Sequence, residues 1–191
     1  MFNQALQFLL KTIVDLFVLA ALVRFFLQMF RAPFRNPISE FVMALTDFAV
    51  KPLRRFVPGL RGVDLASFVF AWGLETLLVL FLLGLQGHIG LPDSLRAVPI
   101  AICLAFINLL KYSIYLLILA TFAQALLSWL NPYSPVSSVL DSLTRPFLLP
   151  LRKIVPMISN IDLTPLVLFV VCQLILMLPL AWLESLAIKM V

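Results

Sequence analysis

Long apolar stretches alternate with shorter polar ones along this chain. Within each long stretch the apolar residues are continuous, and about 20 apolar residues in a helix cross the hydrocarbon core of a bilayer. We therefore predict four membrane-spanning helices, at about residues 8–30, 65–85, 111–130 and 163–183. The fold class is an all-α membrane protein, because backbone polar groups in lipid must find their partners within each helix.

Two shorter stretches, at about residues 37–50 and 135–145, have apolar residues on one helical face only. Each follows a cap residue, Asn36 or Ser134, and begins with a proline. The apolar positions are Ile38, Phe41, Val42, Leu45 and Phe48 in the first stretch, and Val136, Val139, Leu140 and Leu143 in the second. This pattern predicts two amphipathic helices that lie in the membrane interface, each ending at a proline.

The chain also contains a tandem repeat. Residues 46–68 (TDFAVKPLRRFVPGLRGVDLASF) match residues 144–166 (TRPFLLPLRKIVPMISNIDLTPL), with prolines, a basic pair and an aspartate kept in register. We infer two units, residues 1–90 and 91–191, each made of two spans joined by a linker that holds one amphipathic helix.

The third apolar stretch is too long for one span. A helix over residues 97–130 would measure about 50 Å at 1.5 Å per residue, more than the core thickness. The repeat matches Lys11 with Lys111, which places the span at 111–130. Residues 94–110 then extend this helix outward, lie on the outer surface, or form a fifth span.

Composition supports a membrane location and charge gives the orientation. The chain is 63% hydrophobic and 12% charged, whereas a soluble domain is about half apolar and a quarter charged. No cleavable signal peptide is recognisable in residues 1–30. The linker cations are Arg31, Arg35, Lys51, Arg54, Arg55 and Arg61 in unit one, and Arg145, Arg152 and Lys153 in unit two. Between spans two and three there is only Arg96, so both linkers are predicted to be cytoplasmic and both termini outside.

Each linker carries a basic patch after its amphipathic helix. The patch residues are Lys51, Arg54 and Arg55 in unit one, and Arg152 and Lys153 in unit two. Two interpretations stand side by side: contact with anionic lipid or a protein partner, and topology determination alone.

Asp64 and Asp162 directly precede the second and fourth spans. Each carboxylate can cap its helix by accepting from the first free N–H groups. We also predict that Arg54 pairs with Asp64, and Arg152 with Asp162.

Polar residues inside the spans recur at equivalent positions. Arg24 in span one matches Gln124 in span three, and Glu75 in span two matches Gln173 in span four. Because a lone charge in hydrocarbon is costly, we predict that Arg24 and Glu75 pair directly. The four residues either hold helices together or line a polar path.

Nothing in the sequence predicts catalysis or a cofactor. Cys103 and Cys172 lie in apolar segments and are interpreted as small buried hydrophobes, and His88 stands alone in a Gly-rich loop. We expect no metal site, no cofactor, no nucleic-acid partner and no enzymatic activity.

The segment TRPFLLPLRKIVPMISNIDLTPLVL resembles the basic-proline segment of the YggT family, which is followed by an Asp-Leu-Ser-Pro opening to the next span. Thr164 takes the Ser place, while unit one has Ala66 and Ser67 where Thr164 and Pro165 stand. The resemblance covers nearly the whole chain as two units. It implies a bacterial-type inner-membrane protein with relatives linked to osmotic-stress tolerance, to cell-division gene neighbourhoods and, in plastids, to haem attachment to a cytochrome b. It supplies no catalytic residue, and the haem link does not transfer, since no span contains His and no CxxCH occurs.

Two functions follow as hypotheses. The first is a non-enzymatic assembly or scaffold protein whose basic linkers contact anionic lipid, an unidentified membrane-protein partner or a second copy. The second is a small channel or transport component for ions or osmolytes, with the intramembrane polar residues as its path.

Overall fold

A computed structural model describes residues 2–33, 36–59, 62–85, 94–131, 134–155 and 162–189, and within them all regular structure is helical. Arg35, Arg61 and His88 lie outside the described residues.

In the described ranges, four helical rods are long and apolar enough to span a membrane. They are α1 (Phe2–Met29), α3 (Leu65–Leu85), α4 (Ser94–Leu130) and a rod made of α6 (Thr164–Ile175), η1 (Leu176–Leu180) and α7 (Ala181–Ile188). Large apolar side chains are exposed along all four rods, as lipid-facing surfaces require. The chain is therefore a multi-pass helical membrane protein. Pro179 lies in η1, a single π-helical turn, where its missing N–H is accommodated within a continuous rod.

The third span is longer than residues 111–130. Residues 94–110 continue without a break into the rest of α4, so of the three alternatives the structure shows the one in which they extend this helix. Ala101, Leu104 and Ile107 are buried against Val79 of α3 and against the α6–α7 rod, at the depth of the second and fourth spans. The match between Lys11 and Lys111 shows which residues of the two units are equivalent. It does not show which turns of α4 pack against neighbouring helices. At 37 residues α4 is about 55 Å long, longer than the core is thick.

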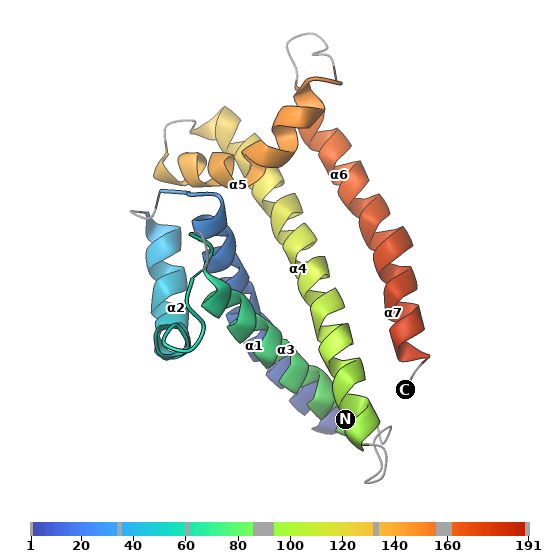
Figure 1. The fold of residues 1–191 in the computed structure, drawn as a ribbon. Coiled ribbons are helices and arrows are strands. Elements are labelled where there is room, and N and C mark those ends of the chain that lie inside the picture. Colours follow the sequence, from blue (N-terminus) through green and yellow to red (C-terminus); the bar gives the residue numbers. More distant parts are fainter. Residues whose placement is uncertain are drawn as a thin grey trace.

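The spans form a row in which α4 lies between the α1–α3 pair and the α6–α7 rod (Figure 1). Both termini lie at one end of the row. We call the opposite end, where α1 finishes and α3 and α6 begin, the linker end; α2 (Pro37–Leu53) and α5 (Pro135–Arg152) connect the spans there.

The linker helices begin where the sequence predicts but end later. Asn36 accepts from the Ser39 N–H at 2.9 Å, and Ser134 accepts from the Ser137 N–H at 3.1 Å. The predicted ends near residues 50 and 145 are wrong. Prolines lie inside both helices, namely Pro52, Pro146 and Pro150. A proline lacks a backbone N–H and therefore removes one helical hydrogen bond. Near the end of a helix the neighbouring residues still form their own hydrogen bonds.

The buried faces of α2 and α5 correspond to each other. The matching positions are Val42 and Leu140, Thr46 and Thr144, and Val50 and Leu148. Phe41 and Phe48 are exposed, so α2 turns its threonine side toward the protein and these two phenylalanines outward. The Phe48 ring also lies 5.8 Å from that of Phe17 in α1, which shows that α2 packs along the spans. The interfacial position of the two helices stays a prediction.

Cysteine labelling tests the predicted orientation. Ser39 is buried, so the suitable linker positions are Glu40 and Ser138, which are exposed, with Lys189 for the opposite end. After replacement of Cys103, which is exposed, and Cys172, a membrane-impermeant maleimide should reach Cys at 40 and 138 only from the cytoplasm. It should reach Cys at 189 from outside. Labelling of position 40 or 138 from outside intact cells would show that the orientation is the opposite of the predicted one.

Candidate functional site

Asp64 is the centre of a buried ionic cluster at the linker end. Its side chain is 1% exposed and accepts from the Nε and Nη2 groups of Arg54, with the Arg54 Nε at 3.3 Å, and from the Ser67 hydroxyl at 2.7 Å. The Arg24 Nε lies 3.3 Å from the same carboxylate. The Ser67 backbone N–H, at 3.4 Å, adds the predicted cap of α3.

These contacts decide the ionisation of the cluster. Burial by itself raises the pKa of Asp64, but hydrogen bonds from Arg54 and Ser67, with the charges of Arg54 and Arg24, hold that pKa below its ordinary value. The Asp64 hydrogen bond in turn raises the pKa of Arg54. The cluster is thus a carboxylate held by two guanidinium groups.

Arg24 joins α1 to the linker helix. Its Nη1 donates to the Thr46 hydroxyl and to Asp47, both at 2.8 Å. The second Asp47 oxygen accepts from Lys51 at 2.8 Å. The hydrogen bond from Lys51 lowers the pKa of Asp47, and Arg24 adds to this against the opposing effect of burial.

The predicted pairing of Arg24 with Glu75 is wrong. Arg24 contacts Asp64, at the level where α3 begins, while Glu75 lies 11 residues further along, about 16 Å away along the axis. The repeat shows which residues are equivalent in the two units, but it does not give their depth, and Arg24 lies level with the start of α3.

Unit two has a reduced version of this cluster. Gln124 donates to Asp141 at 3.1 Å and is hydrogen-bonded to Thr144, the counterpart of Thr46. Arg24 and Gln124 thus meet matching threonines on α2 and α5. The 98-residue offset already aligned these threonines, so this contact could have been found from the sequence. Gln173 is half-buried on α6, while both Gln124 contacts are made with α5.

The predicted pairs across each linker are confirmed. Arg54 bonds Asp64, and the Arg152 Nε lies 3.0 Å from Asp162. Asp162 also accepts from the Thr164 N–H at 2.9 Å, although the cap position of α6 itself is Leu163. Burial opposes the shift, but bonds from Thr164 and the charge of Arg152 lower the pKa of Asp162.

The basic patches are therefore only partly available for binding. Lys51, Arg54 and Arg152 are each engaged by an aspartate. Arg55 and Lys153 are exposed, and neither has an ion-pair partner among the described residues.

The residue after each of these cations is apolar and almost fully exposed. Phe56 is 83% exposed and Ile154 is 78% exposed. Both units thus present a cation followed by an apolar side chain directly after the linker helix, at Arg55-Phe56 and Lys153-Ile154.

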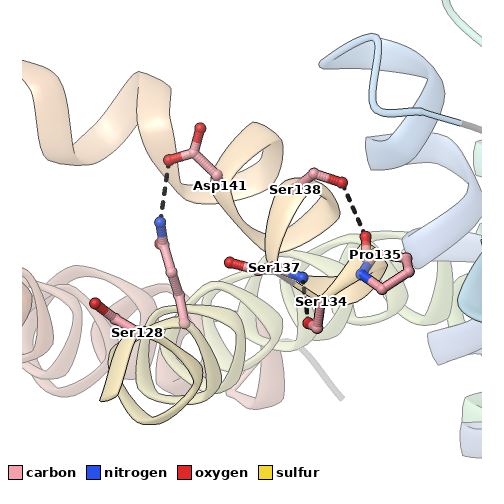
Figure 2. A pocket seen from close by; sticks show the side chains of 7 residues that line it. Ser128, Ser134, Pro135, Ser137, Ser138 and Asp141 are labelled. Atoms are coloured by element: carbon pink, nitrogen blue, oxygen red, sulfur yellow. Dashed lines mark hydrogen bonds between the residues drawn. The ribbon is translucent and has the colours of Figure 1, made fainter. Parts of the chain in front are cut away.

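Two adjacent hollows lie beside α5. The first, about 450 Å³, is bounded by the last turns of α4 and the first turns of α5 (Figure 2). Its hydroxyls serve the helix start, since Ser134 caps α5 and Ser138 donates to the Pro135 carbonyl. The second, about 440 Å³, shares Asp141 and is lined by Arg31 at the end of α1 and Arg145 of α5.

A second polar cluster lies between α1, α3 and α4 in the apolar layer. Asn108 donates to Glu75 at 2.8 Å, and the Tyr112 hydroxyl donates to Asp15 at 2.9 Å. Lys111 forms an ion pair with Glu184, which ties α4 to α7. The sequence analysis missed Asp15, Asn108 and Tyr112 because their contacts join distant parts of the chain. Among the described residues, no group of three His, Cys, Asp or Glu side chains could hold a metal ion.

Comparisons with known proteins match the chain over most of its length. A family model described as CCB3/YggT matches residues 3–86 and again residues 103–183, and each segment falls within one unit inferred from the repeat. The chain is similar to an uncharacterised protein of Pseudomonas aeruginosa (36% identity over 179 residues, 92% of this chain and 88% of the relative). It is also similar to an uncharacterised protein in the proC 3′ region of Vibrio alginolyticus (34% over 172 residues, 88% and 90%) and to YggT of Escherichia coli K12 (32% over 171 residues, 89% and 86%). No solved structure matches the chain.

Proposed function

The chain belongs to the CCB3/YggT family, and we propose that it is a non-enzymatic scaffold or assembly factor of the bacterial-type inner membrane whose linker end binds anionic lipid headgroups. One observation carries this proposal: both units expose a cation without an ion-pair partner among the described residues, followed by an apolar side chain, at Arg55-Phe56 and Lys153-Ile154.

This pairing of side chains suits the membrane interface. An apolar side chain gains by leaving water for the acyl boundary, and the adjacent cation then meets the phosphates. Each basic residue near an anionic surface contributes about 1 kcal/mol. The partnered cations, Arg54 and Arg152, instead hold each linker to its span, so binding and structure are assigned to different residues of the patch.

The hollow between α1 and α5 is a second place where a headgroup would fit. Arg31 and Arg145 line it together with Asp141 and with apolar side chains, including Phe30 and Leu149. Two guanidinium groups beside an apolar wall match a phosphate headgroup with its acyl chains. A lipid seated there would touch both units and brace them against each other.

As an assembly factor, the protein would present this lipid-bound surface to an unidentified membrane-protein partner or to a second copy. The family resemblance favours a process of the cell envelope, such as division or tolerance of osmotic stress. With the linkers cytoplasmic, the surface would face the inner leaflet.

Lipid selectivity tests the proposal. We expect Arg55→Gln with Lys153→Gln to reduce the preference of the purified full-length protein for phosphatidylglycerol over phosphatidylcholine by about tenfold or more, since two contributions of about 1 kcal/mol are removed. Native mass spectrometry of lipids retained from mixed micelles measures this preference. The matched control is Lys11→Gln with Lys189→Gln, which removes two exposed charges away from the linker end and should leave it unchanged.

An unchanged preference in the Arg55/Lys153 variant would refute lipid binding by this surface. If that variant instead loses a cross-linked protein in cells, the surface docks a protein rather than lipid.

A second candidate, a small channel or transport component, is favoured by the buried carboxylate of Glu75. Ion or osmolyte flux in reconstituted vesicles that persists in the Arg55/Lys153 variant would make transport the main function.

A further inference from the structure

Glu75 is an isolated acid in the apolar layer. It is the middle residue of α3 and is 2% exposed. Its Oε1 accepts from Asn108 at 2.8 Å, whereas its Oε2 is fully buried and has no hydrogen-bond partner among the described residues. A carboxylate in hydrocarbon with an unmet oxygen is unfavourable by several kcal/mol, so a neutralising group is required.

No basic side chain in the described part of the chain supplies that group. Arg24 is bound by Asp47 and Asp64, and Lys111 by Glu184. On α1, Lys11 and Asp15 both lie within electrostatic range of Glu75, but Lys11 is exposed and makes no ion pair with it. On α2, which also packs against α3, Asp47 and Lys51 pair with each other.

The remaining surroundings are oxygen-rich. Asp15 faces the site from α1 and Tyr112 from α4, and the Tyr112 proton is donated to Asp15 at 2.9 Å. Carboxylate, hydroxyl and amide oxygens are the ligands that hard cations prefer. Unit two has Tyr115 and Gln173 where unit one has Asp15 and Glu75, so the two acids occur in unit one alone.

We propose that Glu75 is the binding residue of an exchangeable monovalent-cation site between α1, α3 and α4, occupied by a proton or an alkali-metal ion. Either occupant neutralises the carboxylate and satisfies Oε2. Asn108 orients the carboxylate through Oε1, and Asp15 adds the negative charge that attracts a cation. This inference does not rest on lipid binding at the linker end, which involves other residues.

Carbodiimide labelling tests the site in the full-length protein in mild detergent. Dicyclohexylcarbodiimide enters apolar sites and reacts with a protonated carboxyl: the acid oxygen bonds to the central carbon while the proton moves to nitrogen, and the adduct rearranges to a stable N-acylurea. Peptide mass spectrometry should locate the adduct on Glu75, and Glu75→Gln should abolish it. Labelling should fall several-fold as the pH is raised.

The two occupants give different results when Na⁺ or K⁺ replaces choline at constant ionic strength. Protection of Glu75 by the metal ion identifies an alkali-ion site, and labelling that responds to pH alone identifies a proton site. Gln173→Glu is the matched control, because it places an acid at the equivalent position of unit two without Asp15 and Asn108, and its labelling should not respond to Na⁺ or K⁺.

Two outcomes would overturn the proposal. One is absence of an adduct on Glu75 while the acid at position 173 is labelled. The other is labelling of Glu75 that responds neither to pH nor to metal ions.

Discussion

Replacing Asp64 by asparagine is expected to lower the free energy of unfolding in mild detergent by about 2–3 kcal/mol. Removing one partner of a buried ion pair leaves an uncompensated charge, which usually lowers stability by slightly more than this. The loss is moderated here because Arg24 keeps Asp47 as a partner and Arg54 is partly solvated. The substitution also weakens the cap of α3, since an amide offers one acceptor oxygen to Ser67 and the two arginines.

The repeat provides the control for this prediction. Asp162 occupies the equivalent position, but its side chain is 31% exposed, and among the residues that the structure describes it pairs with Arg152 only. Solvent screens that pair, so Asp162→Asn should change stability by no more than about 1 kcal/mol. Equal losses for the two variants would show that burial of Asp64 is not what makes its cluster stabilising.

The pH dependence of this difference has a definite sign. The pKa of folded Asp64 is below the ordinary value of 3.8, so its stabilisation is present above that value. It is lost as the pH falls through the lowered pKa. Thermal unfolding should therefore show a constant gap between wild type and Asp64→Asn near neutral pH, closing below about pH 4.

The parts of the fold that depend on local pattern were predictable. The second span was placed correctly because Leu65–Leu85 is one uninterrupted apolar run with Asp64 before it. The Arg54–Asp64 and Arg152–Asp162 pairs were predictable because both units carry the same residues ten positions apart. The start of α4 was not, since an apolar stretch longer than a span does not reveal which turns pack against neighbours.

The site was harder to predict because depth and long-range contacts decide it. Arg24 reaches Asp64 and Asp47 at the linker end, as long side chains do when they carry their charge out of the apolar layer. The Tyr112–Asp15 bond joins residues 97 positions apart, and only the packing of α1 against α4 brings them together. Aligning the two units shows which residues are equivalent, but it does not predict contacts between one unit and the other.

The contact between α4 and α7 should depend on the pair Lys111–Glu184. Glu184→Gln is expected to lower the free energy of unfolding by about 2–3 kcal/mol, because Lys111, with a side chain 19% exposed, is left charged within the apolar layer. Lys111→Met with Glu184→Gln should recover most of this loss, since removing both charges of a pair lowers stability far less than removing one.

Lys11→Met is the matched control: it alters the equivalent lysine, which is exposed, and should leave the free energy of unfolding nearly unchanged. The apolar contacts of Leu176 and Leu180 with α4 remain in every variant, so the recovery isolates the ion pair. If the losses in the double variant are additive, the two side chains do not stabilise each other, and α7 is held to α4 by apolar packing alone.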